Sequence, residues 1–514
     1  MRKFLLLIAA ALFTTATYAQ TEELWNSSIV AVGEMDAVDF NSPAAMDNEG
    51  NLYVTGTQTQ SFEFAGKDAE VLALGAYIAK YNAKGEEQFA ITLHGSISIT
   101  AITTDAENNF YVAGSFADMA YITDVEGIGG EYETIQNSEA DSKTAAFIAK
   151  YDANGNLLAV KSYEAAANWD AFDLTRVSVS KIVADNSKIY VQFDYTGDFT
   201  VEENLSLVAK YVFYDFGGWG MAVLKNNVSV ISFDTNFENA AVIASLAIAD
   251  NGDVSTSINS FNFAVEGDDV YVAAFGMGNL VLTTSAGSEA FDFAFDGEGT
   301  TESGAIVAKV GAKAVKFSNI PTSVYAPSEE IVAMDIRDNK IYLAGAFGVT
   351  CAFDNSKVAA GASDVFVASL DANELTTNWV YTNANDEGET NKYYEEVTGV
   401  AFGKDNVYVV DAVTDMNNAE DPVAKNYAVS YTGEGKEAAA IAATAVAYNN
   451  EYVAFINYTD ATYISMYNEA VTTAIENVET EVENNVIYDL TGRRIEKITN
   501  AGIYIVNGCK VLVK

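Results

Sequence analysis

Short runs in which apolar and polar residues alternate recur along the whole chain, separated by turn residues. The most regular run contains Tyr-Val or Tyr-Leu and follows a turn rich in Asp, Asn and Gly. Aromatic and β-branched residues with a period of two fit a pleated, half-buried strand, and the turn residues accept the backbone angles of hairpins. The pattern predicts strands around Tyr53, Tyr111, Tyr190, Tyr271, Tyr342, Tyr408 and Tyr452.

A second run follows each of these strands. It reads "AYIAKYNAKGE" at residues 76–86 and "AFIAKYDANGN" at 146–156. Further copies begin at Trp219, Ala305, Val365, Asn426 and Thr462. A run of small residues precedes each tyrosine strand, and a fourth, often aromatic run follows the repeat, as at 87–93, 157–163 and 228–234. Each unit therefore predicts four short antiparallel strands.

The seventh unit has no fourth strand of its own, because residues after 468 lose the pattern. The missing strand matches residues 22–32, in which Trp25 takes the place that Trp379 has in the fifth unit. Four-stranded sheets repeated around an axis make a β-propeller. The predicted fold is all-β, a seven-bladed propeller of four-stranded antiparallel blades whose last blade is closed by the N-terminal strand, plus a small C-terminal β-module.

The composition of the chain limits the classes of partner that it can bind. The chain of 514 residues is 49% hydrophobic and carries 72 acidic against 28 basic residues, a net charge of −44. A surface of this sign repels phosphate backbones and anionic lipid headgroups, so we expect no nucleic-acid partner. Two cysteines, Cys351 and Cys509, exclude a disulfide-rich scaffold.

The two ends of the chain differ from its body. Residues 1–19 combine a basic start, an apolar run and a small-residue cleavage site, which is typical of a secretory signal peptide. We expect a propeller over 20–470, an acidic linker over 471–485 and a β segment over 486–514. No other run is long enough for a transmembrane helix after signal cleavage. The predicted location is secreted or at the cell surface, with the periplasm as the alternative.

The repeat resembles the SBBP-type seven-bladed β-propeller repeat of extracellular proteins of Bacteroidota. Its hallmarks are a turn, Tyr-Val-small-Gly, and then an aromatic-Ile-Ala-Lys-Tyr run with a closing turn. Residues 47–86 and 105–156 carry the pattern best, and the resemblance spans about 22–470. It implies the propeller fold and an extracellular setting, and it brings no shared catalytic residues.

The C-terminal segment is similar to the end of the sorting domain of type IX secretion, through "YDLTGRR" and "AGIYIV". The resemblance implies recognition by export machinery. The matching residues are Tyr488, Asp489, Gly492, Arg493, Arg494, Gly502 and Tyr504. The segment is shorter than such domains, and Cys509 departs from the pattern; the alternative is a small β-module that docks on the propeller.

Candidate chemistry is sparse. The single histidine, His94, is predicted at the surface or edge of an outer strand. A Ser-His-Asp triad or a histidine zinc site would have to use this one residue, which disfavours both. Asp152, Asn154 and Asn156 alternate oxygen ligands around a glycine, so calcium is the one cofactor considered, although the distal Glu of a calcium loop is missing. Trp169 and Trp219 lie beside acids in long connections and could stack on a ligand.

The leading interpretation is an exported, non-catalytic binding or scaffold protein that engages a protein or glycan partner through its blade loops. The alternative is an extracellular carbohydrate-active hydrolase or lyase with paired carboxylates in a central depression. A third is a structural adhesion component. The enzyme predicts acids that converge at the mouth of the central tunnel; the binding protein predicts an aromatic or uncharged patch.

Overall fold

The computed structural model divides into two units, Glu22–Glu469 and a second unit of Met1–Thr21 with Ala470–Lys514. The predicted signal peptide 1–19 and the acidic linker 471–485 lie outside the residues that the structure describes. The described residues are 23–29, 42–58, 60–70, 74–130, 132–138, 142–168, 170–171, 173–185, 187–215, 217–218, 220–250, 254–293, 300–301, 303–318, 322–323, 330–348, 350–359, 362–383, 393–415, 423–438, 443–449, 451–458, 461–468, 487–489, 494–495, 502–506 and 509–513.

The larger unit is built from meanders, which are four-stranded antiparallel sheets of successive strands. The first meander consists of β2 (Ala44–Met46), β3 (Leu52–Gln58), β6 (Gly75–Tyr81) and the start of β7 (Glu87–Thr104). The second consists of the end of β7, β8 (Phe110–Thr123), β10 (Ser142–Tyr151) and β11 (Leu157–Tyr163). The third consists of β12 (Thr175–Asp185), β13 (Lys188–Tyr195), β18 (Asn227–Asp234) and β19 (Ala241–Ile248).

The later meanders repeat this order. The fourth consists of β20 (Ser257–Glu266), β21 (Asp269–Thr284), β24 (Ser303–Lys309) and β25 (Lys313–Ser318), and the fifth of β27 (Glu330–Arg337), β28 (Lys340–Phe347), β31 (Asp364–Asp371) and β32 (Thr377–Thr382). The sixth consists of β33 (Tyr393–Phe402), β34 (Asn406–Asp415), β35 (Val423–Ser430) and β36 (Gly435–Ala438). The last consists of β37 (Ala445–Tyr448), β38 (Tyr452–Tyr458), β39 (Thr462–Asn468) and, from the start of the chain, β1 (Glu23–Ile29).

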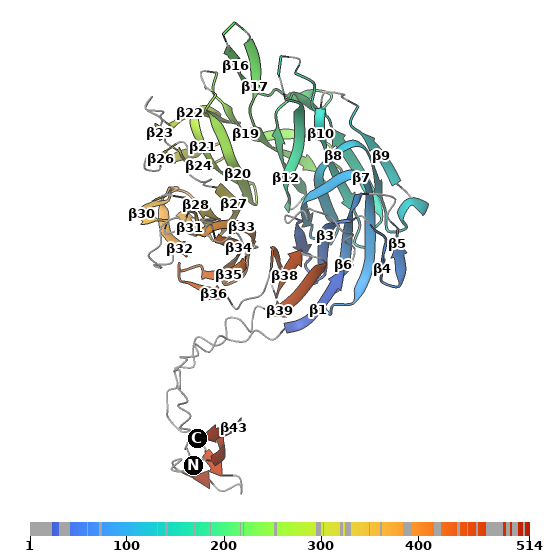
Figure 1. Ribbon diagram of the computed structural model, residues 1–514, viewed down its shortest axis with the longest axis vertical. Coiled ribbons are helices and arrows are strands. Elements are labelled where there is room, and N and C mark those ends of the chain that lie inside the picture. The colour runs from blue at the N-terminus through green and yellow to red at the C-terminus, as the bar shows by residue number, and fades with distance from the viewer. Residues whose placement is uncertain are drawn as a thin grey trace, which may run out of the picture. The chain divides into compact units, whose positions relative to one another are not determined.

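Figure 1 shows the meanders following one another in chain order around a common centre. The hydrophobic clusters lie between consecutive meanders, and one of them joins β38 and β39 to β3 and β6. Third strands such as β6 and β18 are buried on both faces, because each sheet has a neighbour on either side. The described residues form no α-helix, only a 3-10 turn at Gly127–Gly129, and no helix among them has the length and apolar character to cross a bilayer.

The third unit departs from the sequence prediction. We expected its third strand at 219–229 and its fourth at 228–234. Instead, β18 is the third strand, paired with β13, and β19 is the fourth. The prediction was wrong because residues 220–224 imitate the repeat but are mostly only partly buried, whereas 227–233 are buried on both faces of the strand.

Short hairpins fill several connections between second and third strands, which the sequence prediction treated as variable loops. They bury apolar side chains such as Phe64, Phe199 and Phe353 against the meander edges. The hairpins are β4 (Phe62–Phe64) with β5 (Lys67–Ala69), β14 (Phe199–Glu202) with β15 (Leu205–Leu207), β16 (Tyr211–Asp215) with β17 (Gly220–Leu224), and β29 (Thr350–Cys351) with β30 (Asp354–Val358).

Other strands extend the meanders or pair outside them. β9 (Tyr132–Gln136) pairs with the end of β8, and β22 (Gly287–Phe293) pairs with the end of β21. β23 (Thr300–Thr301) pairs with β26 (Thr322–Ser323). The second unit contains a small antiparallel sheet in the order β41 (Arg494–Ile495), β40 (Ile487–Asp489), β42 (Gly502–Val506) and β43 (Cys509–Val513).

Candidate functional site

The residues of the sorting-like motif lie on the small sheet where they are described. Tyr488 and Asp489 belong to β40, Arg494 begins β41, and Gly502 and Tyr504 lie in β42, which pairs directly with β40. Gly492 and Arg493 lie outside the described residues. The two motif strands are thus neighbours in one sheet, a pairing that the sequence prediction did not address.

The proposed calcium turn is closed by its own hydrogen bonds. The Oδ1 atom of Asp152 accepts from the backbone amides of Asn154 and Asn156, both at 2.9 Å, and Oδ2 accepts from the side-chain amide of Asn156 at 2.7 Å. Desolvation opposes these bonds, but their sum lowers the pKa of Asp152. Among the described residues, no group of three or more His, Cys, Asp or Glu side chains is arranged to hold a metal ion. Calcium stays an untested candidate ligand of this turn.

His94 is buried, not at the surface as the sequence prediction had it. Only 2% of the residue is exposed, and its Nε2 lies 3.2 Å from the hydroxyl of Thr92. Burial lowers the pKa of His94, while the charge of Glu70 opposes that shift. The error has a physical cause: β7 continues from one meander into the next, so the end of the predicted outer strand is covered.

Trp169 and Trp219 lie outside the described residues, but the segments around them meet. The amide of Ala222 in β17 donates to the carbonyl oxygen of Asp170 at 2.7 Å, and Ala171 forms a parallel bridge with Ala222. Two connections that are separate in sequence, one on each side of β12 and β13, are therefore side by side.

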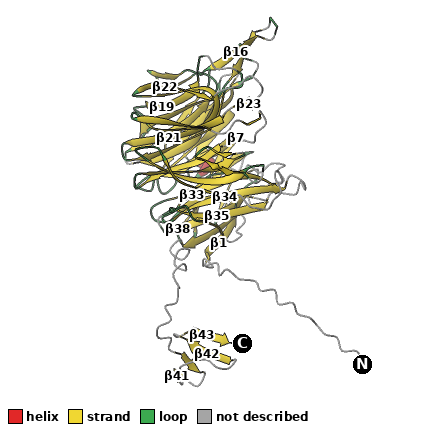
Figure 2. Cartoon of the chain, turned by 90° about the vertical axis from the view of Figure 1, so that its left-hand side faces the viewer, coloured by secondary structure: helices red, strands yellow, loops and turns green. Residues whose placement is uncertain are grey.

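The hairpin of β16 and β17 is the most exposed aromatic feature of the described surface. Phe213 is 62% exposed, and Tyr211 and Tyr214 are 44% and 41% exposed. Figures 1 and 2 both show β16 at the tip of a projection from the larger unit. The ring of Phe213 covers Gly220, where an added Cβ would lie 2.4 Å from it, so the hairpin is shaped by its own sequence. Exposed aromatic side chains grouped in this way are typical of binding surfaces.

Acidic side chains gather where strand β33 begins and β34 ends. Glu395 is 4% exposed and Asp411 is fully buried. Within the described residues, both carboxylate oxygens of Asp411 have no hydrogen-bond partner, although the backbone amide of Glu396 and the side chain of Lys425 are near enough to oppose its pKa shift. Burial first, and then the charge of Glu395, raises the pKa of Asp411.

The neighbouring Glu395 is better satisfied. Its Oε2 accepts from the side-chain amide of Asn383 at 2.6 Å and from the amide of Val365 at 3.3 Å. Burial raises the pKa of Glu395, the bond from Asn383 opposes the shift, and the charge of Asp364 adds to it. The sequence prediction missed this cluster, but it contained a signal: Asp411 interrupts the apolar strand "NVYVVDAV".

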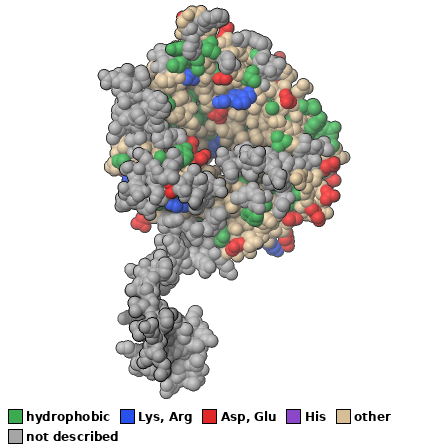
Figure 3. Space-filling model, in the orientation of Figure 1, with side chains coloured by type: hydrophobic (Ala, Val, Ile, Leu, Met, Phe, Trp, Pro, Cys, Tyr) green, Lys and Arg blue, Asp and Glu red, His purple; other side chains and the backbone are tan. Residues whose placement is uncertain are grey.

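Two further acids have raised pKa values at corresponding ends of central strands. Burial raises the pKa of Asp194 near the end of β13, against hydrogen bonds from Ser180, Asn226 and Gln192. Burial and the charge of Glu396 raise the pKa of Glu330 at the start of β27. Both residues are only partly buried. Figure 3 shows the surface hollowed at the centre of the meanders, with acidic and basic side chains at the edge of the hollow.

Lys181 of β12 connects three meanders. Its amino group donates to Oδ1 of Asn262 at 2.6 Å, to the carbonyl of Phe263 at 2.7 Å and to the carbonyl of Met334 at 3.3 Å. Burial lowers the pKa of Lys181 to about 8, while the charge of Asp335 opposes the shift. All three donor positions of the ammonium are used, which is the arrangement of a structural cross-link.

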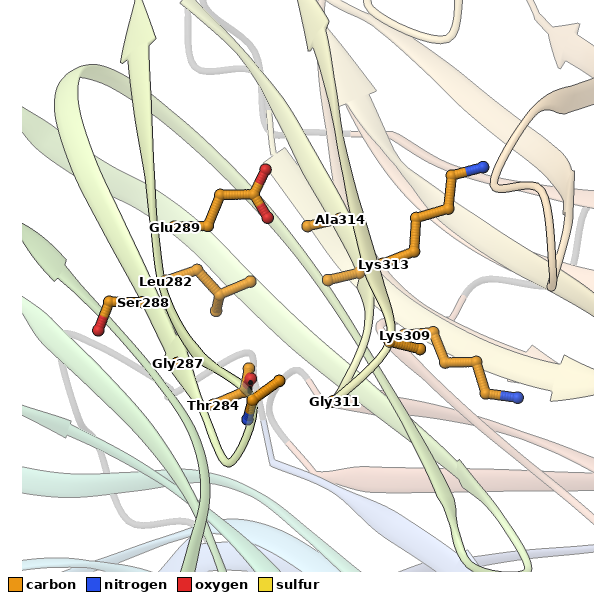
Figure 4. A pocket seen from close by; sticks show the side chains of 12 residues that line it. Leu282, Thr284, Gly287, Ser288, Glu289, Lys309, Gly311, Lys313 and Ala314 are labelled. Carbon is orange, nitrogen blue, oxygen red and sulfur yellow. Dashed lines mark hydrogen bonds between the residues drawn. The ribbon is translucent and has the colours of Figure 1, made fainter.

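The described residues of the larger unit line cavities of which two are informative. One of about 380 Å³ lies between the β4–β5 hairpin, the start of β7 and the 3-10 turn, and an ion pair of Lys67 and Glu126 at 3.4 Å spans its edge. A second, of about 180 Å³, is lined by β21, β22, β24, β25 and the turns between them, where Leu282, Glu289, Lys309 and Lys313 stand among small residues. In Figure 4 the ends of Lys309 and Lys313 point away from this cavity; they pair with Asp269 and Glu374.

No family model matches the chain. No curated protein matches it either. Solved structures similar to it include the Dos1 propeller, at 9% identity over 87% of this chain and 95% of that one with a TM-score of 0.37.

Two further structures match at comparable levels. The β-propeller domain of Cps50 (Swd1) from Myceliophteria thermophila has 9% identity, covers 86% of this chain and 99% of its own, and gives a TM-score of 0.37. The polysaccharide lyase Uly1 has 9% identity, covers 88% and 95%, and gives a TM-score of 0.35. These neighbours include β-propeller domains. At scores this low, the likeness assigns no activity, ligand or partner to this chain.

Proposed function

We propose that the meanders are the blades of a seven-bladed β-propeller of the SBBP-like kind and that β1 closes its ring. The first strands support this, because each contacts the first strand of the next meander and β37 contacts β2. Side chains cross the same seam. The hydroxyl of Tyr458 donates to the carbonyl of Thr55 at 2.8 Å, and Tyr77 and Thr462 share a hydrogen bond of 2.6 Å.

The proposed role is binding or scaffolding of a partner outside the cell, without catalysis. The observation that carries it is the projecting hairpin of β16 and β17, with Tyr211, Phe213 and Tyr214 exposed together. Aromatic rings can stack on the apolar face of a sugar ring or pack on an apolar protein surface. Neighbouring Asp170 and Asp215 could accept hydrogen bonds from hydroxyl or amide groups of such a partner.

The test is a glycan array and a pull-down of surface proteins with the purified protein, each repeated with Phe213→Ser combined with Tyr211→Ser. We expect this variant to lose at least about tenfold in affinity, as for a central aromatic contact. Tyr132→Ser removes a tyrosine of similar exposure outside the hairpin and serves as the matched control. Equal binding by the hairpin variant and the control would refute the assignment of the site.

A second candidate is a carbohydrate-active hydrolase or lyase in the central hollow. Asp194 and Glu330 favour it, because burial raises the pKa of both carboxyl groups and a raised pKa is the direction that a general acid needs. A reducing-sugar assay on candidate polysaccharides tests this. Turnover that disappears in Asp194→Asn or Glu330→Gln would replace the binding proposal with the enzyme; ligand binding without turnover would remove the enzyme.

We further propose export by the N-terminal signal and recognition of residues 486–514 by sorting machinery. The support is the motif on the small sheet and the apolar N-terminal run. Cell fractionation should show the full chain at the surface or outside the cell, and a chain that lacks 486–514 retained inside the envelope. Unchanged localisation of the shortened chain would contradict the sorting role.

A further inference from the structure

The contact between the fifth meander (β27, β28, β31 and β32) and the sixth (β33 to β36) is built on polar side chains at one end. Ser363 exchanges two hydrogen bonds with the backbone of Glu395, accepting from its amide at 2.8 Å and donating to its carbonyl at 2.6 Å. Asn383 accepts from the amide of Val365 at 2.8 Å and donates to the hydroxyl of Tyr427 at 2.9 Å. Ser363, Val365 and Asn383 belong to the fifth meander, and Glu395 and Tyr427 to the sixth.

The carboxylate of Glu395 is the centre of this network. Its Oε2 accepts hydrogen bonds from the side-chain amide of Asn383 at 2.6 Å and from the backbone amide of Val365 at 3.3 Å. These bonds favour the ionised form of Glu395 over the neutral form. The network is itself buried, since Ser363, Asn383 and Glu395 are each less than a tenth exposed.

Asp411 lies on the same face of the sheet as Glu395, because it pairs with Val397, two residues along β33 from Glu395. Asp411 lacks the hydrogen bonds that support Glu395. It is fully buried, and both its oxygens are unpartnered within the described part of the chain. An unpaired charge in such a place is costly, and the group avoids that cost by keeping its proton. The charged and titratable groups that face it are Asp364 from β31, Glu395 from β33, and Lys425 and Tyr427 from β35.

The geometry points to a proton-dependent joint between the fifth and sixth meanders. We propose that Asp411 and Glu395 together hold one proton while the joint is closed, and that loss of this proton opens it. When the proton is lost, Asp411 carries a negative charge beside those of Glu395 and Asp364. The positive charge of Lys425 partly offsets the repulsion among these carboxylates. Of these acids only Asp364 belongs to the fifth meander, so its repulsion from the doubly charged pair of Glu395 and Asp411 is what acts across the boundary that the hydrogen bonds join.

Because the pKa values of Glu395 and Asp411 are both raised in the folded chain, the direction in which pH changes the stability of the joint is defined. Carboxyl groups whose pKa is higher in the folded chain than in the unfolded chain bind more protons when folded. Stability of the joint is therefore greatest below the ordinary carboxyl range and falls as the pH rises from there through the raised pKa values. An acid pair stabilised by salt bridges would show the opposite slope.

Hydrogen exchange of the full chain across a pH series tests the joint. After correction for intrinsic exchange, peptides that contain β31, β33 and β34 should lose protection by at least about tenfold as the pH rises from about 6 to about 9, the size expected for one pKa unit of coupling. Peptides of β8 and β10 in the second meander should not follow. In Asp411→Asn, which keeps the shape and removes the charge, the joint should lose this pH dependence.

A control variant and a spectroscopic measurement accompany the exchange experiment. Asp250→Asn removes the same charge from an exposed aspartate whose pKa is lowered by Lys210, and it should leave the pH dependence of the joint unchanged. If Asp411→Asn does not fold, infrared spectra of the unmodified chain at neutral pH should still contain the carbonyl band of a protonated buried carboxyl that vanishes at high pH. Absence of that band, or an identical pH slope in Asp411→Asn, would overturn the proposal.

Discussion

The amino group of Lys181 lies 2.6 Å from Oδ1 of Asn262, and so joins the first strands of two consecutive meanders. The side-chain amide of Asn262 continues the connection, donating to the carbonyl of Val332 in the next meander at 2.7 Å. Thr104 makes a similar bond to the carbonyl of Met46 at 3.1 Å on the other side of the centre. Polar side chains thus connect central strands that share no backbone pairing.

Replacement of Lys181 by methionine tests this connection. Lys181→Met keeps most of the apolar stem but leaves the acceptors on Asn262, Phe263 and Met334 without the ammonium, so we expect a loss of about 2 kcal/mol in the free energy of unfolding. Denaturant unfolding measures it. Lys161→Met, at an exposed position of β11, is the control and should change stability by less than about 0.5 kcal/mol. Equal effects of the two changes would show that the cross-link is energetically unimportant.

The repeated tyrosines differ in their hydrogen bonds. The hydroxyl of Tyr111 donates to Oδ2 of Asp105 at 2.9 Å, whereas the hydroxyl of Tyr53 is 3.4 Å from Oδ2 of Asp47, which is long for an O–H donor. We expect Tyr111→Phe to cost about 1.5–3 kcal/mol, the range for a bond to a charged group, and Tyr53→Phe clearly less. Thermal unfolding of the two variants compares them at equivalent positions. A larger loss for Tyr53→Phe would contradict the geometry.

Trp25 tests the role of the N-terminal strand. Its ring stacks on Tyr81 with centroids 5.5 Å apart, and its Nε1 donates to the carbonyl of Ala83 at 3.2 Å, so β1 is packed on the first meander while paired with the last. We expect Trp25→Ala to cost about 3 kcal/mol. It should also expose β1 to limited proteolysis. Intact protection of β1 in the variant would argue against closure through this residue.

Trp379 gives the matched comparison for Trp25. Each tryptophan covers a turn glycine with positive φ in the next meander, Gly85 for Trp25 and Gly433 for Trp379. Trp379→Ala should lower stability by a similar amount but leave β1 protected, because β1 pairs with β39 and Trp379 lies in β32, which pairs with β31. The pair of variants separates a general packing loss from opening of the ring.

The turn at Asp152 should respond to acid more than to calcium removal. Its hydrogen bonds give the folded chain a lower pKa for Asp152 than the unfolded chain has, so its contribution is present above the ordinary carboxyl pKa and is lost as the pH falls through the lowered value. Asp152→Ala should lower the melting temperature at neutral pH and remove this part of the acid sensitivity. A chelator should leave the melting temperature unchanged; a rise on adding calcium, absent in Asp152→Ala, would establish the calcium site instead.

The repeated unit could be predicted from the amino-acid sequence alone. Alternation around Tyr53 and its later copies predicted the second strands, and the "AKY" run predicted the third, because these residues must fit a pleated sheet buried on both faces. Even the pairing of the N-terminal strand was predictable, since the last unit lacked one strand and residues 22–32 supplied the pattern. These features depend on local period and composition.

Only the packing of the meanders decided which segment forms the third strand in the third unit and which buried polar side chains come together. Residues 220–224 carry the local pattern of a third strand, yet β18 takes that place. The apolar side chains of β18 are buried more completely between two sheets, and this burial stabilises the fold more. The meeting of Glu395 with Asp411 was equally hidden. Their side chains converge only when β33 pairs with β34 and packs on the fifth meander, and no spacing in the sequence encodes that distance.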